Sequence, residues 1–278
     1  MAWQALFELQ ESAVAPANER TLARYRPTLR PVQVGALTAL VVTPSASIHP
    51  RARIVYLHGG AYTVFSAHST LFASVPLAHE LGMELWSIDY PSAPRSRYDR
   101  TVPLAQDAVR AACADGVPVL LVGDSAGGGL ALAVARRLSE DRAAGPRALA
   151  LWSPWADPGA SLASRTALAG FDPVLRSAMD LELCALAYAP RERLCDPDVS
   201  PLRAAYSAAF PPTLIQCGSR EILLRDAVGL HFRLARAGAR PILDLVPGMV
   251  HSFPAVLPDL PESRAARRRM ASFFSRLV

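Results

Sequence analysis

A serine in the middle of the chain lies among small residues that could expose it, in the stretch Gly123-Asp124-Ser125-Ala126-Gly127. An apolar run precedes this stretch and an apolar, alanine-rich segment follows it, which predicts a buried strand, a tight turn and a helix. Such a turn holds the serine hydroxyl exposed on a strained backbone. The amide of Ala126 and the positive end of the helix dipole would favour a developing oxyanion beside it. We therefore predict that Ser125 is a nucleophile; the alternative is an ordinary glycine-rich turn.

A histidine and two acidic residues follow predicted strands later in the chain. Glu221 lies in the loop just past one strand, whereas Asp226 falls within the helix after that loop. His251 follows the last predicted strand. A serine nucleophile needs a base, and a histidine base needs a carboxylate that fixes its tautomer. The order serine, acid, histidine is the one in which α/β-hydrolase sheets present a triad. We predict Ser125, Glu221 and His251 as that triad and keep Asp226 as the alternative acid.

Small residues also follow the predicted strand Ile54–Leu57, in the stretch His58-Gly59-Gly60-Ala61-Tyr62. Residues with little or no side chain leave their backbone amides uncovered, and two amides that point at one spot stabilise a tetrahedral oxyanion. Alone, this stretch fits better with a glycine turn that carries a hydrogen-bonded histidine. Together with the stretch around Ser125, it predicts an oxyanion hole.

The composition is that of a single globular domain. The chain has 278 residues, 51% of them hydrophobic, which is enough to bury a large core and to carry a small insertion. Arginine alone carries the net charge of +5, because the sequence contains no lysine. The arginines are scattered except for Arg264, Arg267, Arg268 and Arg269, whose spacing fits the solvated face of a terminal helix. Without a binding motif, this charge predicts no nucleic-acid partner.

The N-terminal segment and the cysteines indicate where the protein works. Met1–Glu19 does not resemble a signal peptide, because Glu8 and Glu11 interrupt its apolar pattern, and no apolar run reaches the length of a membrane span. We therefore expect a soluble, cytoplasmic protein with no membrane insertion. The four cysteines are far apart and lack metal-ligand spacing, so we expect buried free thiols and no metal or organic cofactor.

Short apolar runs alternate with longer amphipathic segments, which predicts a doubly wound α/β core with a mostly parallel sheet of about eight strands. The predicted strands are a hairpin of residues 32–34 and 37–43, then Ile54–Leu57, Leu85–Ile88, Val119–Val122, Ala148–Leu151, Thr213–Cys217 and Ile242–Val246. The predicted helices are Leu71–Leu81, Val102–Ala114, Ala126–Leu138, Leu224–Ala237 and about Glu262–Leu277.

Two segments break this alternation, and we expect them to form a helical cap. Residues 1–30 read as a short helical lead-in followed by a linker. Residues 154–212 hold one convincing helix, Val174–Tyr188, and sit between two core strands. An insertion at the carboxyl ends of the strands would lie above the site. The core is then formed by residues 31–153 and 213–278.

The motifs around His58 and Ser125, with Asp196–Leu202 and Gly248–Phe253, resemble those of the hormone-sensitive lipase family of α/β-hydrolases, which includes many bacterial carboxylesterases. The resemblance runs from about Ile54 to the carboxyl terminus. It implies an α/β-hydrolase fold with a helical cap, and an esterase that acts on short acyl chains without a cofactor. It also implies roles for the site residues: Ser125 as nucleophile, His251 as base and then acid, Glu221 as the residue that orients it, and the amides of Gly59, Gly60, Ala61 and Ala126 as the oxyanion hole.

The sequence departs from the family pattern at three points. Ala61 stands where the family has a third glycine, so its methyl group could narrow the pocket. Glu221 followed by Ile222 replaces the more common aspartate and proline. The stretch Asp89–Pro94 lacks the arginine of the family pattern, so we expect the loop that supports the oxyanion strand to be arranged differently.

The predicted triad does not identify the leaving group of the reaction. We predict a serine carboxylester hydrolase whose partner is a small-molecule ester. Lactone or amide hydrolysis, or a biosynthetic acyl transfer, could use the same triad. A non-catalytic small-molecule-binding protein, like the plant gibberellin receptor that resembles this family, is a further alternative, and the presence of His251 argues against it. The sequence does not specify the natural substrate, and it is compatible with a homodimer.

Overall fold

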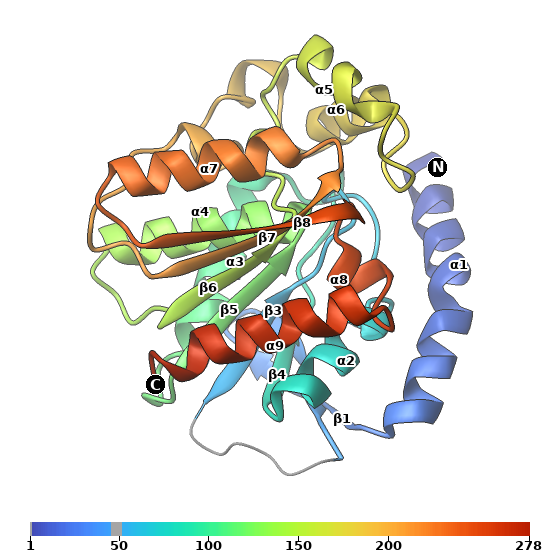
Figure 1. The fold of residues 1–278 in the computed structure, drawn as a ribbon, viewed down its shortest axis with the longest axis vertical. Helices are drawn as coiled ribbons and strands as arrows, with labels where there is room; N and C mark the ends of the chain where they lie inside the picture. The colour runs from blue at the N-terminus through green and yellow to red at the C-terminus, as the bar shows by residue number, and fades with distance from the viewer. Residues whose placement is uncertain (1, 46–51) are drawn as a thin grey trace.

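An eight-stranded sheet forms the centre of the molecule, in the order β1-β2-β4-β3-β5-β6-β7-β8 (Figure 1). The computed structural model describes residues 2–45 and 52–278. The strands are β1 Thr28–Val34, β2 Leu37–Thr43, β3 Arg53–Leu57, β4 Glu84–Ile88, β5 Val119–Asp124, β6 Ala148–Trp152, β7 Thr213–Arg220 and β8 Pro241–Val250. β2 pairs antiparallel with both of its neighbours, and the strands from β4 across to β8 pair parallel. The predicted, mostly parallel sheet is confirmed.

Helices cover both faces of the sheet. The core helices are α2 Leu71–Leu81, α3 Tyr98–Ala112, α4 Ala126–Glu140, α7 Leu224–Arg236, α8 Phe253–Val256 and α9 Pro261–Ser275. Helices α3, α4 and α7 share one hydrophobic cluster with one face of the sheet, and α2 and α9 share a second cluster with the other face. Successive residues of β5 alternate between the two clusters: Leu121 belongs to the first, and Leu120 and Val122 to the second. β5 is buried along its whole length, as its continuous apolar run predicts.

The N-terminal segment differs from the prediction. One long helix, α1, runs from Ala2 to Tyr25 with Pro16 inside it, and β1 begins three residues later, so the short helix followed by a linker is wrong. Contacts outside the helix hold it: the Asn18 side chain accepts a bond from the Phe72 amide at the start of α2. The hairpin of β1 and β2 is confirmed, with Gly35 in the turn at a φ of 58°.

The insertion also differs from the prediction. It contains two helices, α5 Leu162–Ala169 and α6 Ala178–Tyr188, and two short 3₁₀ turns at Arg191–Arg193 and Pro201–Arg203. The sequence pattern missed α5 and placed the start of α6 too early. The serine that directly precedes each helix, Ser161 before α5 and Ser177 before α6, accepts a hydrogen bond from a first-turn amide. These serines are N-cap residues, which mark the start of each helix.

Two predictions about side-chain exposure are wrong. The sequence pattern places Arg267 on a solvated face of α9, but its side chain is fully buried. Its guanidinium donates to the carbonyls of Pro254 and Pro258. Cys195 is exposed and Cys184 is half-buried, whereas Cys113 and Cys217 are buried; all four are free thiols. No helix in the described part of the chain is long and apolar enough to cross a membrane.

Candidate active site

Ser125 lies in the sharp turn between β5 and α4. Its φ of 51° and ψ of −120° are a strained combination for a residue with a side chain. Two glycines permit the turn. A Cβ on Gly123 would lie 2.3 Å from the Gly127 carbonyl oxygen, and one on Gly127 would lie 2.0 Å from the Leu57 carbonyl oxygen. The close passage of β3, β5 and α4 therefore requires glycine at both positions.

Ser125 and His251 line the same cavity, which has a volume of about 470 Å³. The cavity lies where the core meets α1 and the insertion, and Figure 1 shows both near the ends of the strands. Its walls are mostly apolar. Helix α1 contributes Gln10, Ala13, Val14 and Ala17; the core contributes Gly60, Ala61, Val64, Phe65, Phe72, Asp124, Ser125, His251, Ser252 and Val256; the insertion contributes Val174, Leu175 and Leu181.

Glu221 directly follows β7 and is 1% exposed. Its Oε2 accepts bonds from the Ser153 hydroxyl at 2.6 Å and from the Gly218 amide at 3.1 Å. These bonds favour the charged carboxylate, while burial raises the pKa of Glu221. The Ser153 hydroxyl also accepts a bond from the Ser252 amide. Ser153 therefore joins the loop that carries the acid to the loop that carries the histidine.

His251 follows the end of β8 and is 4% exposed. Its Nδ1 and the Oε1 of Glu221 are both buried and, among the described residues, neither has a hydrogen-bond partner. A bond between them would satisfy both atoms. Within the same residues no hydrogen bond joins His251 to Ser125, and Nε2 lies 3.3 Å from the Ser252 hydroxyl. Catalytic bonds are often loose in a ligand-free site and tighten around a substrate. Burial lowers the pKa of His251 to about 4, so the imidazole is neutral near pH 7.

Asp226 points to a different part of the molecule. It is buried in the first turn of α7, and its Oδ2 accepts a bond from the Asp157 amide at 2.8 Å. Burial raises the pKa of Asp226 to about 7, and the nearby Arg165 guanidinium opposes this rise. Asp226 does not line the cavity. These contacts give Asp226 a role in holding the insertion to the core.

The small residues after β3 supply amides at the cavity wall. Gly60 and Ala61 line the cavity, with φ values of 109° and 51°. Among the described residues, the amides of Gly60, Ala61 and Ala126 donate to no protein acceptor. Gly59 is different, because its amide donates to Asp124 Oδ1 at 2.7 Å. In this structure the Gly59 amide therefore fastens the turn to Asp124, and its assignment to the oxyanion hole stays a prediction.

The loop after β4 supports this turn despite the missing arginine. The Tyr90 hydroxyl donates to the His58 carbonyl, and the two rings stack with centroids 4.2 Å apart. The Ala93 amide donates to the Tyr62 carbonyl at 2.7 Å. A tyrosine ring and backbone bonds thus hold the turn in the absence of the arginine of the family pattern.

Sequence reasoning missed two residues that organise the site. Asp124 accepts bonds from the Gly59 amide and the Tyr56 hydroxyl, so it ties the serine turn to the turn after β3. Ser153 links the acid and histidine loops, as described above. Asp124 could have been found from its position inside the serine motif. Ser153 gives no comparable signal, because its partners lie far away in the sequence.

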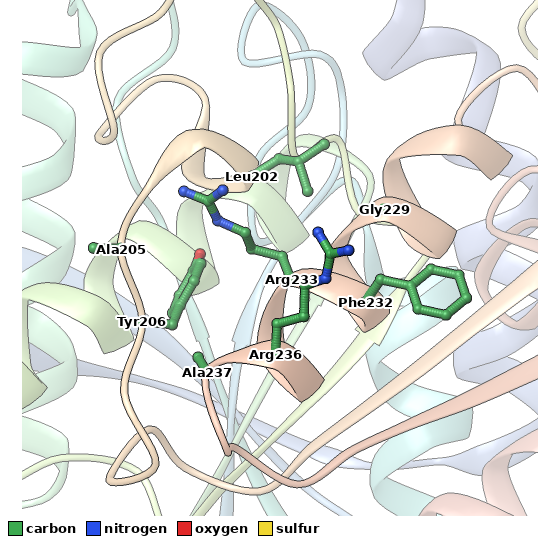
Figure 2. Close-up of a pocket in the computed structure, with 8 residues that line it drawn as sticks. All are labelled: Leu202, Ala205, Tyr206, Gly229, Phe232, Arg233, Arg236 and Ala237. Carbon is green, nitrogen blue, oxygen red and sulfur yellow. The ribbon is translucent and has the colours of Figure 1, made fainter.

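A second cavity, of about 500 Å³, lies between α7 and the segment after the second 3₁₀ turn (Figure 2). Its lining includes none of the predicted site residues. The guanidinium of Arg233 donates to the carbonyls of Arg203 and Ala204 and so holds this segment against α7. In residues 2–45 and 52–278, no three His, Cys, Asp or Glu side chains gather where they could bind a metal ion. The cavity at Ser125 is therefore the candidate active site.

Known proteins share this architecture. A family model described as the alpha/beta hydrolase fold matches residues 54–255. An acetyl-hydrolase from Streptomyces hygroscopicus is 34% identical over 242 residues, which cover 84% of this chain and 78% of that protein. An esterase from Acinetobacter venetianus is 29% identical over 253 residues, which cover 90% of this chain and 82% of that protein.

Solved structures agree in both fold and family. The crystal structure of esterase E25 matches with a TM-score of 0.91 at 26% identity, covering 99% of this chain and 86% of that one. EstE7, a hormone-sensitive lipase homologue from a metagenome library, matches with a TM-score of 0.84 at 27% identity, covering 99% of this chain and 98% of that one.

The sheet and the family match define an α/β-hydrolase. Within that class, the chain belongs to the hormone-sensitive lipase family. It is an enzyme, a hydrolase of the esterase type, and these predictions are confirmed.

Proposed function

We propose that the chain is a serine carboxylester hydrolase that works through an acyl-enzyme. The observation that carries the proposal is the placement of Ser125, on a strained turn, in one cavity with His251 and the free amides of Gly60 and Ala61. His251 takes the hydroxyl proton as Ser125 attacks the ester carbonyl. Glu221 holds the imidazole in the required tautomer and stabilises the imidazolium that forms.

The oxyanion is stabilised by the amides of Gly60, Ala61 and Ala126. Donors fixed by the fold need no reorganisation when charge develops on the carbonyl oxygen, and removing one typically costs a factor of about 100 to 1,000 in turnover. His251 then gives its proton to the departing alcohol. Water attacks the acyl-enzyme by the same route, and the acid product leaves.

We expect the enzyme to prefer short acyl chains. A volume of about 470 Å³ is modest for a small-molecule site, and its walls are mainly apolar. The acetyl-hydrolase relative supports this preference. Residues 1–30 and 154–212 act as the cap, since α1 and the insertion both line the cavity. The cytoplasmic location stays a prediction.

The test is hydrolysis of p-nitrophenyl acetate and butyrate by the wild type and by Ser125→Ala. We expect the substitution to lower kcat by about 10⁴-fold or more, because loss of one triad member removes the covalent route. The unfolding temperature should stay within a few degrees of the wild-type value. A Ser125→Ala variant with full activity would remove Ser125 as the nucleophile.

A further inference from the structure

A buried carboxylate of the insertion, Asp172, lies close to the acid loop. It belongs to the connection between α5 and α6 and is 3% exposed. Its Oδ2 accepts a bond from the Ile222 amide at 3.0 Å. Ile222 directly follows Glu221, so this bond fixes the backbone on which the triad acid is mounted.

The other oxygen of the same carboxylate fixes the wall of the cavity. Asp172 Oδ1 accepts bonds from the amides of Val174 and Leu175, at 2.9 and 3.0 Å. Both of these residues line the cavity that holds Ser125. One side chain therefore joins a substrate-facing segment of the insertion to the loop of the core that carries Glu221.

The three bonds require a carboxylate. An ionised carboxylate is acceptor-only, and here it meets three N–H donors. An asparagine in the same place would turn its NH₂ group towards a backbone N–H on one side or the other. The three backbone N–H groups therefore match a carboxylate at this position better than an amide side chain.

We propose that Asp172 is a positioning residue of the active site, which holds the Glu221–Ile222 backbone against the cavity wall at Val174–Leu175. The proposal rests on the proposed hydrolase mechanism, in which His251 becomes positively charged at each proton transfer. The placement of Glu221, which orients and stabilises that imidazolium, therefore affects each proton transfer.

The electrostatics of His251 agree with this role, because Asp172 raises the pKa of His251 against the larger lowering by burial. Asp172 and Asp226 both raise the pKa of Glu221, which by itself disfavours the ionised acid. Three other carboxyl groups belong to the elements around the site. Glu221 stands on the acid loop, and Asp124, at the end of β5, lines the same cavity and has a pKa raised by burial to about 6. Helix α1 carries Glu11, which accepts a bond from the Ser66 hydroxyl.

The experiment compares Asp172→Asn and Asp172→Glu with the wild type. Asp226→Asn is the matched control, because Asp226 is also a buried carboxylate that binds a backbone amide of the insertion. The measurements are kcat/KM for p-nitrophenyl acetate against pH, the unfolding temperature, and an NMR titration of the His251 ring protons. The NMR titration needs no turnover, so it decides about Asp172 even if the wild type hydrolyses no ester.

We expect Asp172→Asn to lower kcat/KM by about 10- to 100-fold, because small displacements of catalytic groups are costly. Loss of the negative charge lowers the pKa of His251, so the acidic limb of the pH profile and the NMR titration should both move to lower pH. Asp172→Glu keeps the charge and should keep both at the wild-type pH, with reduced activity. Asp226→Asn should leave the His251 titration at the wild-type pH, because Asp172 and not Asp226 shifts the pKa of His251.

Two outcomes would overturn the proposal. The first is an Asp172→Asn variant whose pH profile and histidine titration match the wild type, with a loss of activity no greater than that of Asp226→Asn. The second, which decides the question if Asp172→Asn does not fold, is an Asp172→Glu variant with wild-type activity or with a shifted His251 titration. Either result would reduce Asp172 to a packing residue.

Discussion

Several residues around the cavity adopt backbone conformations that only glycine adopts easily. Ala61, Phe65, Ser125 and Ser252 line the cavity, and all four have φ between 48° and 72°. Each such position costs of order 1–3 kcal/mol and persists only where the surrounding contacts determine it. At Ser125 the amide donates to Trp152 and the carbonyl accepts from Trp155. These two backbone bonds hold Ser125 in its strained conformation.

The two candidate acids can be separated by matched substitutions. Glu221→Gln should lower kcat by about 10³- to 10⁴-fold, because a neutral amide no longer stabilises the imidazolium and favours the wrong tautomer. Asp226→Asn should change kcat less than about threefold, since Asp226 binds the Asp157 amide and lies outside the cavity. Steady-state kinetics on p-nitrophenyl acetate make the comparison. The reverse ranking would make Asp226 the triad acid.

At the scale of elements, short connections place the site by tying helices to strand ends. The buried Arg267 of α9 illustrates this. It donates to carbonyls at Pro254 and Pro258, on either side of the end of α8, and lies 3.7 Å from Glu80 of α2. Helix α8 comes two residues after His251. The arginine thus fixes the segment that follows His251.

Removal of this guanidinium should destabilise the fold. Arg267→Ala leaves two carbonyls without their donor and opens a cavity under α9, so we expect a loss of about 2–4 kcal/mol in the free energy of unfolding. Arg268→Ala is the control: Arg268 also reaches Glu80, but its side chain is 62% exposed, and its loss should cost no more than about 0.5 kcal/mol. Urea unfolding followed by circular dichroism measures both. Equal effects would contradict the structural role of Arg267.

The elements that could be predicted from the sequence are those whose own pattern is strong. Helix α2 has the predicted bounds, and Gly82 ends it in the left-handed conformation at a φ of 61°. Helix α5 was missed because it buries only Arg165 along its length, so it has no apolar stripe to recognise. Helix α1 likewise buries only Thr21, and its length depends on contacts such as Asn18 with Phe72.

In the site, too, local patterns could be predicted and contacts between distant residues could not. The positions of Ser125, Glu221 and His251 after strands could be predicted, because the carboxyl ends of parallel strands share one edge of the sheet. The use of the Gly59 amide by Asp124, and the bond from Ile222 to Asp172, could not. These contacts join residues 65 and 50 positions apart, and no local pattern encodes them.

On the scale of the whole molecule, the chain closes a cavity by bringing its first helix and its insertion to the same edge of the sheet (Figure 1). Stacking reinforces the closure from the insertion side, since Tyr188 of α6 lies on Tyr62 with ring centroids 3.7 Å apart. Tyr62 belongs to the turn that also carries Gly60 and Ala61. The insertion therefore packs directly on the proposed oxyanion turn, which couples its position to the geometry of the candidate active site.

The most direct test of this account is to react the protein with a fluorophosphonate and to map the adduct by mass spectrometry. Only an activated serine nucleophile reacts rapidly with such a probe. We predict one adduct per chain, on the peptide that contains Ser125, no adduct on the Ser125→Ala variant, and much slower labelling of His251→Ala. An adduct on a different residue, or equal labelling of the Ser125→Ala variant, would contradict the central claim that Ser125 is the nucleophile.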